Sequence, residues 1–224
     1  MFHQIHGIKE QIESRYKGGR LSANSRSCPK GLCNDLTLLF LNTDTFEPTR
    51  FFRFPLPTIL EYLENTHTYY LGKCLDEIAL GINLLTYQSD YKKYWKPVLT
   101  QVFSTYAAEL KKHIDEEENE LFPYIKSLME ASKSGIMNFS FEQKLMLIQH
   151  LLNHTDDPEN KLRSLIRLLE SKKEHFADQL ALNVLISKLK SFERDLMVHA
   201  RLEEEVLIPR ALELEKEILQ RAEF

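Results

Sequence analysis

Over most of the chain after Thr58, apolar side chains recur every three to four residues, which is the spacing of one face of an α-helix. Four long segments show this period: residues 57–86, residues 91–131, a third segment that starts near residue 140, and residues 176–220. Short polar stretches separate them. Four amphipathic helices with short connections predict an all-α fold, an antiparallel up-down four-helix bundle.

The third segment contains a proline that should interrupt it. The sequence TDDPEN occupies residues 155–160, and Pro158 lies inside the helical pattern. A proline inside a helix removes one backbone hydrogen bond and crowds the preceding turn. At the first position of a helix it costs nothing, and Asp is a favoured N-cap. We therefore expect a kink here, with Asp157 as the N-cap and Pro158 as the first residue of a restarted helix.

The first 53 residues differ from the remainder. They carry eight Lys or Arg against five Asp or Glu, a net charge of +3, whereas the rest of the chain is at −7. The segment DLTLLFLNTDTF within them fits a short helix or a strand equally well, because its apolar run has no clear period. We expect an N-terminal extension at residues 1–53 and the helical bundle at residues 54–224.

The overall composition excludes several classes of protein. The chain is 43% hydrophobic and 28% charged with only seven Gly and eight Pro, which favours a helical fold. A net charge of −4 argues against a nucleic-acid binder. No stretch approaches the roughly 18 apolar residues of a membrane helix, and the N-terminus lacks the apolar core of a signal peptide. We expect a soluble, cytoplasmic protein.

The cysteines predict no disulfide framework. The three of them, Cys28, Cys33 and Cys74, are too few and too scattered for one. Cys28 and Cys33 lie five residues apart in CPKGLC, a spacing that matches no strong metal or redox motif. We expect them to be ordinary thiols.

Two stretches repeat one polar pattern 86 residues apart, HIDEEENELFPYI at 113–125 and HARLEEEVLIPRA at 199–211. Each has His, then Glu four and five residues later, Leu at eight and Pro at ten. His and Glu four residues apart share a helix face, which is otherwise apolar in both stretches. A carboxylate in the core is costly unless it is paired or bound to a metal. Each pair taken alone therefore fits metal ligands, a buried hydrogen bond between His and Glu, or a helix edge that faces water.

The other two helices favour a metal. His67 lies on the apolar face of the first helix, and His150 and His154 share a face of the third. Every helix therefore offers imidazole to one interior, and two helices add a carboxylate. The candidate metal ligands are His67, His113, Glu117, His150, His154, His199 and Glu203.

A set of seven nitrogen and oxygen ligands without a thiolate suits iron best, and manganese or zinc less well. They are too many for one ion and fit two ions bridged by Glu117 and Glu203. Two glutamates and a bridging hydroxide would cancel three of the four positive charges of two divalent ions. The chain has no H-E-x-x-H run of a zinc hydrolase, and the carboxylate di-iron bundles use Glu-x-x-His instead. The sequence thus predicts a di-iron site suited to a small diatomic ligand.

These motifs resemble the hemerythrin-like (HHE cation-binding) superfamily, nearest to its bacterial iron-sulfur cluster repair branch. The resemblance covers about residues 58–215 and is sharpest in HIDEEENELFP and HARLEEEVLIP, while HLLNHTDDPENKL resembles the third-helix motif. It implies a four-helix bundle with the seven ligands above. His150 would complete the His-x-x-x-His pattern of oxygen-carrying hemerythrins. If His150 is not a ligand, one coordination position of one iron stays open or is filled by Tyr87 or Tyr91.

The resemblance implies a di-iron protein that binds O₂ or nitric oxide in oxidative or nitrosative stress, or that repairs iron-sulfur centres in client proteins. The repair proteins carry an adjacent Cys-Cys pair that this chain lacks. One alternative is a metal-dependent sensor or transcriptional regulator that acts through residues 1–53. Another is a purely structural, metal-free bundle whose polar residues form buried hydrogen bonds. The apolar residues Leu71, Tyr106 and Leu151 would limit water access to the metals. Glutamates that flank the ligands are expected to be solvated charges: Glu116, Glu118 and Glu204.

Overall fold

The computed structural model describes residues 2–17, 28–42, 46–87, 92–135 and 158–222. Regular secondary structure within these ranges is entirely helical. The predicted all-α class is therefore confirmed.

Two short helices and one turn of 3₁₀-helix form the N-terminal part: α1 (Phe2–Lys17), α2 (Lys30–Leu41) and η2 (Pro48–Arg50). The apolar run that fitted helix or strand is helical, because it lies within α2. The buried residues of α2 recur at helical spacing, at Leu32, Leu36 and Leu39. Burial of that face decides a question that local sequence left open.

Three of the predicted long segments are continuous helical rods, and each contains one five-residue turn of π-helix. The first rod consists of α3 (Leu56–Tyr69), the π turn η3 (Tyr70–Cys74) and α4 (Leu75–Tyr87). The second consists of α5 (Lys92–Glu116), the π turn η4 (Glu117–Leu121) and α6 (Phe122–Ser134). The last consists of α10 (Gln179–Leu202), the π turn η6 (Glu203–Leu207) and α11 (Ile208–Ala222). The sequence pattern predicted the rods but not their π turns.

Helix α9 (Pro158–Ser171) belongs to the third predicted segment and begins at Pro158, as expected. Asp157, its expected N-cap, lies outside the described residues. A 3₁₀ turn, η5 (Lys173–His175), follows α9. Local signals also mark the end of α6 and the start of α10. Gly135 closes α6 in the left-handed region at φ 73° and donates its N–H to the carbonyl of Ala131, and Asp178 accepts the N–H of Ala181 at the start of α10.

Contacts divide the chain into two compact units. The first comprises the described residues of 1–66, 114–156 and 198–224, and the second those of 67–113 and 157–197. The division therefore passes through the rods and does not isolate residues 1–53. The expected domain boundary at residue 53 stays a prediction.

The first unit has one apolar core. Helices α1 and α2 contribute Ile12, Leu32 and Leu36 to it, and the rods contribute side chains such as Phe122 and Leu207. All five are at most 1% exposed. The N-terminal helices α1 and α2 thus share the core of the rod segments that carry the repeated motif.

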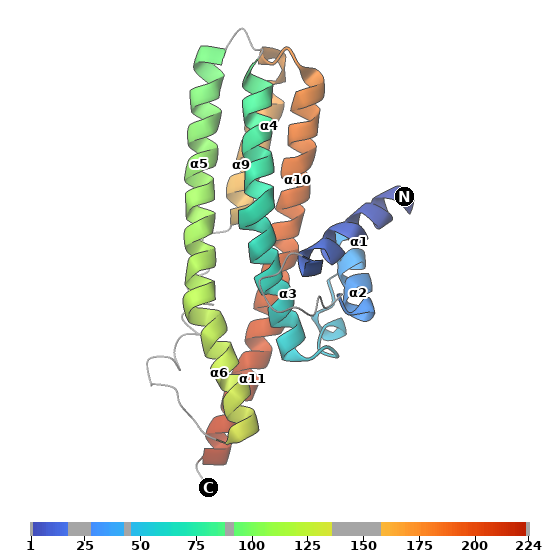
Figure 1. The fold of residues 1–224 in the computed structure, drawn as a ribbon, viewed down its shortest axis with the longest axis vertical. Coiled ribbons are helices and arrows are strands. Elements are labelled where there is room, and N and C mark those ends of the chain that lie inside the picture. Colours follow the sequence, from blue (N-terminus) through green and yellow to red (C-terminus); the bar gives the residue numbers. More distant parts are fainter. Residues whose placement is uncertain (1, 18–27, 43–45, 88–91, 136–157, 223–224) are drawn as a thin grey trace. The chain divides into compact units, whose positions relative to one another are not determined.

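In the second unit, helices α4, α5, α9 and α10 lie side by side (Figure 1). Gly81 permits a close approach of α4 to α10, because a Cβ at this position would meet the Leu185 side chain at 3.0 Å. Ion pairs link the helices at the surface: Lys161–Glu109, Arg163–Glu193, Lys190–Glu170 and Lys188–Glu77. Exposed pairs of this kind contribute at most about 1 kcal/mol each, so the buried apolar face stabilises the unit.

Burial largely agrees with the apolar stripes read from the sequence. Leu63, His67 and Tyr70 are buried on the first rod. The helical period of the second segment predicts that Val102 shares the apolar face of Tyr106 and Leu110. This prediction was wrong, because Val102 is 41% exposed and its neighbour Phe103 is buried instead. A period of 3.6 residues leaves the edge of a stripe uncertain by one residue, and packing decides which neighbour points inward.

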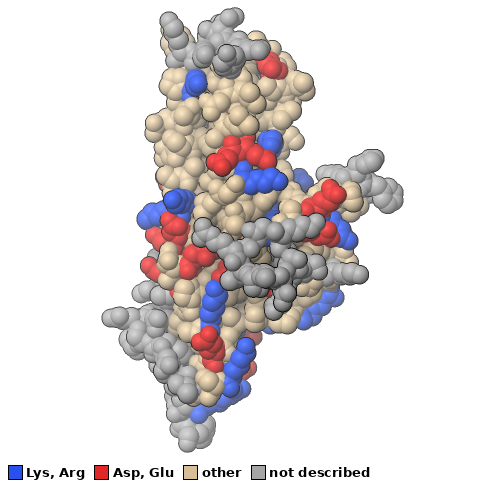
Figure 2. Space-filling view, in the orientation of Figure 1, with Lys and Arg blue, Asp and Glu red and all other residues tan. Residues whose placement is uncertain are grey.

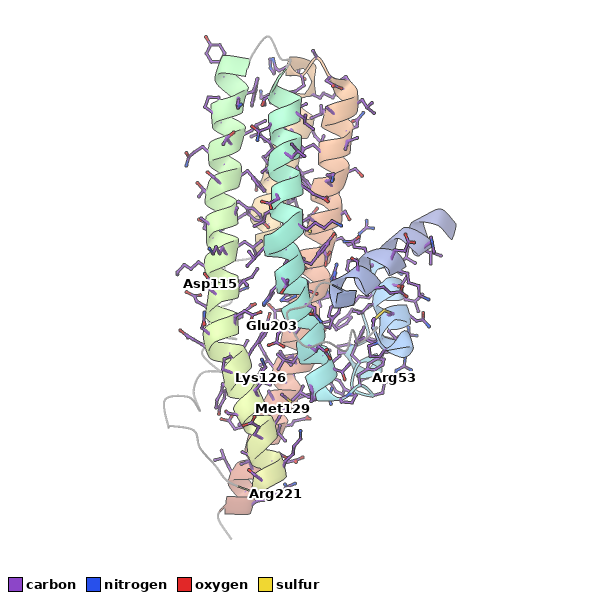
Figure 3. The ribbon with its side chains drawn as sticks, viewed as in Figure 1. Arg53, Asp115, Lys126, Met129, Glu203 and Arg221 are labelled. Carbon is purple, nitrogen blue, oxygen red and sulfur yellow. A yellow bond between two sulfur atoms is a disulfide. The ribbon has the colours of Figure 1, made fainter. Side chains whose placement is uncertain are left out.

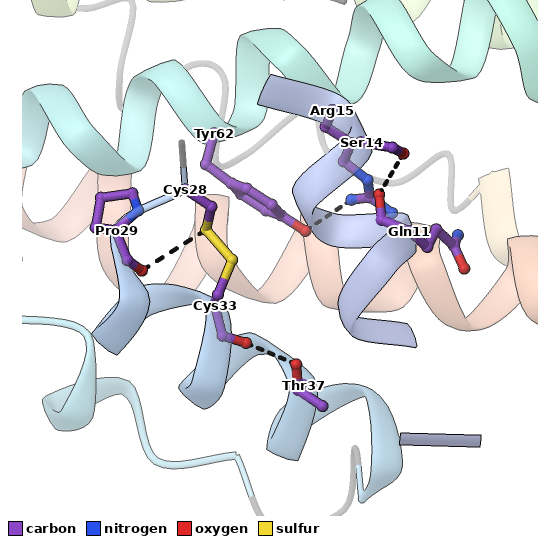
Figure 4. Close-up of a disulfide and its surroundings, with 8 residues drawn as sticks. All are labelled: Gln11, Ser14, Arg15, Cys28, Pro29, Cys33, Thr37 and Tyr62. Atoms are coloured by element: carbon purple, nitrogen blue, oxygen red, sulfur yellow. Dashed lines mark hydrogen bonds between the residues drawn. A yellow bond between two sulfur atoms is a disulfide. The ribbon is translucent and has the colours of Figure 1, made fainter. Parts of the chain in front are cut away.

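Cys28 and Cys33 are joined by a disulfide, which corrects the expectation of two ordinary thiols (Figure 4). Cys28 precedes α2, and Cys33 lies in its first turn. Both belong to the apolar core of the first unit, at 5% and 1% exposed. Sequence reasoning missed the bond because it asked whether the spacing matched a motif. One turn of helix is enough to bring the two sulfurs together.

Acidic and basic side chains are interspersed on the face drawn in Figure 2. In the part of the chain that the structure describes, no helix has the length and apolarity needed to cross a lipid bilayer.

Candidate metal centre

Each π turn lies next to a predicted metal ligand. Glu117 is the first residue of η4 and Glu203 is the first residue of η6. His67 lies three residues before η3. Single π turns inside α-helices are rare and are found frequently at functional sites. The backbone is therefore irregular where the sequence predicts metal chemistry.

The π turns of the two repeats have a cause in the sequence. In the first repeat, the N–H of Phe122 bonds to the carbonyl of Glu117, five residues back, and Pro123 follows. Proline has no N–H, and its ring crowds the carbonyl four residues before it. The wider turn relieves that crowding. The second repeat has the same arrangement, with Pro209 after its turn.

Glu117, His199 and Glu203 form the centre of the site, and all three belong to the first unit. Both carboxylates are 0% exposed, and His199 is 7% exposed. The Nε2 atom of His199 lies 3.7 Å from a carboxylate oxygen of Glu203 and 4.0 Å from one of Glu117. These separations exceed the roughly 2.7–3.2 Å of a hydrogen bond. Glu203, labelled in Figure 3, is on the rod that carries His199.

His67, on helix α3, is 2% exposed and belongs to the same group of possible ligands. His67, Glu117 and His199 each offer one ligand atom, and these atoms all lie within 4.8 Å of one another. Three buried residues from three rods are thus close enough to hold a metal ion.

The donor set fits a metal ion. Imidazole nitrogen and carboxylate oxygen lie about 2.0–2.2 Å from zinc and similar ions, so two ligands of one ion lie at most about 4.4 Å apart. The distances of 3.7 and 4.0 Å fall within that limit. Donors of this kind suit iron, manganese and zinc. A divalent cation would also offset the cost of placing two carboxylates in an apolar interior.

The remaining predicted ligands are not all placed with this group. His113 is half-buried on α5, one turn before Glu117, and is not among the three grouped residues. Glu203 approaches His199 but is likewise outside that group of three. His150 and His154 lie outside the described residues, as does Tyr91. The full set of seven ligands therefore stays a prediction.

The residues expected near the ligands have varied surroundings. Glu116 is exposed, whereas Glu118 and Glu204 are half-buried. Leu71, expected to limit water access, lines a hollow of about 550 Å³ between α4 and α5 in the second unit. Tyr106 is 5% exposed and packs edge-on against Phe192. Leu151 lies outside the described residues.

Two buried hydrogen bonds from tyrosine to a carboxylate were missed by sequence reasoning. Tyr70 donates its hydroxyl to Asp195 at 2.9 Å, and Tyr124 donates to Glu215. All four residues are at most 8% exposed. Asp195 precedes His199 by four residues, so its position on the same face was a signal in the sequence. In the repeated motif, by contrast, the glutamates follow the histidine.

The surroundings of Tyr124 raise the pKa of its hydroxyl above the usual value of 10.0. Burial is the largest cause because it disfavours the phenolate. The hydrogen bond to Glu215 and repulsion from that carboxylate act in the same direction. In the folded protein Tyr124 therefore keeps its proton at pH values where an unfolded chain loses it.

We expect this difference to make stability fall at high pH. Above about pH 10 the unfolded chain binds one proton fewer at Tyr124 than the folded chain, so the free energy of unfolding decreases by up to about 1.4 kcal/mol per pH unit. Tyr124→Phe should remove this contribution and cost about 1–3 kcal/mol near neutral pH, because Glu215 loses a donor. Urea unfolding between pH 8.5 and 11 measures both effects. Tyr94→Phe, at a side chain that is 74% exposed, is the control and should keep the wild-type slope. Equal slopes for the wild type and Tyr124→Phe would contradict the prediction.

The candidate metal centre combines buried imidazoles and carboxylates, π turns beside them, and separations that suit a common ion. None of the known family models, curated proteins or solved structures matches this chain.

Proposed function

We propose that this chain is a hemerythrin-like protein whose antiparallel up-down four-helix bundle holds two iron ions and binds O₂ or nitric oxide. Its role would be in the response to oxidative or nitrosative stress, or in the repair of iron-sulfur centres in client proteins. The ligands would be the two histidine–glutamate pairs of the repeated motif together with His67, His150 and His154.

The ion pairs of the second unit support the antiparallel arrangement. Along α9, Arg163 pairs with Glu193 of α10, and Glu170, seven residues later, pairs with Lys190. As the residue number rises along α9, the number of the partner residue on α10 falls, which is the pattern of two antiparallel helices. Four apolar helix faces with short connections favour the same bundle.

One observation carries the proposal: His67, Glu117 and His199 are buried and close enough to hold a metal ion. Two of these residues come from the two copies of the repeated motif. The second glutamate of that repeat, Glu203, is also fully buried and 3.7 Å from His199. This is the arrangement expected if each copy supplies one imidazole and one carboxylate that would hold the metal.

The chain's own residues would fix the chemistry of such a centre. Glu117 and Glu203 would neutralise cationic charge, and the imidazoles would hold the ions in a fixed geometry. The surrounding core would exclude water, since Leu121, Leu202 and Val206 are at most 1% exposed. When bound, reduced iron supplies an open coordination position for a diatomic ligand.

The test is elemental analysis of the protein purified from iron-replete cells, with optical spectra before and after exposure to O₂ and to nitric oxide. We expect about two irons per chain and absorption bands that respond to at least one of the gases. One metal ion per chain would count against His150 as a ligand and against a two-iron centre. A folded protein that contains no metal, and takes up none when iron is supplied anaerobically, would refute the proposal.

A metal-dependent regulator is the second candidate, and one contact favours it. Arg15 of α1 is 3% exposed and donates to the Tyr62 hydroxyl at 2.7 Å (Figure 4). It also donates to the Thr66 hydroxyl at 3.2 Å. Thr66 directly precedes His67, so the N-terminal part is bonded to the helix turn that carries a candidate ligand. The regulator is favoured if metal loading alters the protease sensitivity of residues 1–53 and the optical bands do not change on exposure to O₂ or nitric oxide.

A further inference from the structure

The hydrogen bond between Tyr70 and Asp195 is deeply buried. The Tyr70 hydroxyl donates to a carboxylate oxygen of Asp195 at 2.9 Å, and each residue is 1% exposed. Phe192 packs edge-on against the Tyr70 ring, with the ring centroids 5.1 Å apart. All three residues belong to the second unit. Since a carboxylate in an apolar interior is costly, this bond holds Asp195 to one arrangement.

The two partners are placed one helical turn from two candidate ligands. Tyr70 follows His67 by three residues along the first rod, and Asp195 precedes His199 by four residues on α10. Residues three or four apart lie on the same helix face. The bond therefore joins the rods that carry the two imidazoles, beside the imidazoles themselves.

We propose that Tyr70 and Asp195 are positioning residues for His67 and His199, an inference that rests on the proposed metal centre. Metal sites require ligand distances within about 0.2 Å of their preferred values, and ligands must be held within about 0.5 Å of the productive geometry. The Tyr70–Asp195 bond fixes the spacing of the two rods at the turn next to the ligands. It thereby sets the separation of the two imidazoles before a metal arrives.

The chain contains a matched control for this inference. Tyr124 and Glu215 form the same kind of buried bond, but in α6 and α11 of the first unit. Tyr124 follows Glu117 by seven residues, about 10 Å along the helix at 1.5 Å per residue. A purely structural role predicts that removing either tyrosine hydroxyl has the same consequences. A positioning role predicts that only Tyr70 matters for the metal.

The experiment compares Tyr70→Phe with Tyr124→Phe in the full chain. Cobalt(II) serves as the probe, because its optical bands report coordination without redox chemistry, and a competing chelator gives its dissociation constant. Urea unfolding of the metal-free proteins measures stability separately. We expect both variants to unfold at lower urea concentration. Tyr70→Phe should also bind cobalt about 10- to 100-fold more weakly, with altered bands, whereas Tyr124→Phe should keep the wild-type affinity and spectrum.

Variants of Asp195 provide an independent second test, which holds even if Tyr70→Phe fails to fold. Asp195→Asn retains a carbonyl oxygen that can accept the Tyr70 hydroxyl, so it should bind cobalt within about threefold of the wild type. Asp195→Ala removes the acceptor and should reproduce the loss expected for Tyr70→Phe.

The outcomes separate this inference from the proposed function. If the wild type binds cobalt and the Tyr70 and Asp195→Ala variants bind it equally well, the positioning role is wrong and the metal centre stands. If the wild type binds neither cobalt nor iron(II), the metal centre itself is wrong, and the positioning role is refuted with it.

Discussion

Glu117→Gln is expected to lower the affinity of the protein for a divalent metal ion by more than about 100-fold. Loss of a group that merely supports a ligand typically costs 10- to 100-fold, and Glu117 is proposed as a ligand itself. The substitution keeps the size and shape of the side chain, so the core around this fully buried position should stay packed. Cobalt(II) titration against a chelator measures the affinity, and elemental analysis measures the metal that is retained on purification.

The neighbouring residue supplies the control. Glu116 precedes Glu117 on the same rod and is exposed, so Glu116→Gln changes the net charge by the same amount without entering the core. It should bind metal like the wild type. With metal at 100 times the dissociation constant, the wild type and Glu116→Gln should gain about 2.7 kcal/mol of stability, and Glu117→Gln should gain almost none. Equal affinities for the two variants would remove Glu117 from the ligand set.

Deleting Gly72 is expected to preserve the fold, whereas deleting Lys190 should destabilise the protein by about 5 kcal/mol or more. Gly72 is the middle residue of the π turn η3. This turn contains five residues, about one more than a turn of α-helix. Removing one residue there lets the rod continue as regular α-helix, and the buried residues of α4 keep their side of the helix. Gly72 and Lys190 are both exposed, but Lys190 lies in regular helix between the buried residues Leu189 and Phe192. Its loss rotates one half of α10 by about 100° and moves several large apolar side chains out of the core, each worth about 2–5 kcal/mol.

Circular dichroism and urea unfolding distinguish the two deletions. The deletion of Gly72 should leave the helical signal and a cooperative transition, while the deletion of Lys190 should abolish the transition or shift it strongly. If both deletions unfold the protein alike, η3 is required by the packing of the first rod and is not a tolerated insertion into an α-helix.

The candidate site was only partly predictable, and the reason differs from residue to residue. Glu117, Glu203 and His199 were found because their spacing put polar groups on an otherwise apolar face, and all three are buried. Asp195 has the same kind of placement, but a carboxylate that precedes a histidine was not part of the repeated motif. The helical period places Tyr70 on the apolar face of the first rod, and nothing in the sequence shows where its hydroxyl bonds.

The fold was predictable wherever the signal is local. Helical periodicity, Pro158 at the start of α9 and the polar stretch around Gly135 each act within a few residues of the chain, and the corresponding helix bounds agree with the structure. The π turns η4 and η6 were not predicted, because the prolines that follow them were noted only as part of the repeated pattern and both helices were expected to be regular throughout. A proline two positions after a π turn explains how such a helix can continue.

The sequence by itself determined that the chain is helical, which face of each rod is apolar, and that carboxylates and imidazoles lie on that face. Only the tertiary structure decided which side chains lie close together. These are His67 with Glu117 and His199, Tyr70 with Asp195, and Cys28 with Cys33. Periodicity specifies a direction around one helix. Which residues meet also depends on the register between rods that are far apart in sequence, and that register is fixed by how the whole core packs.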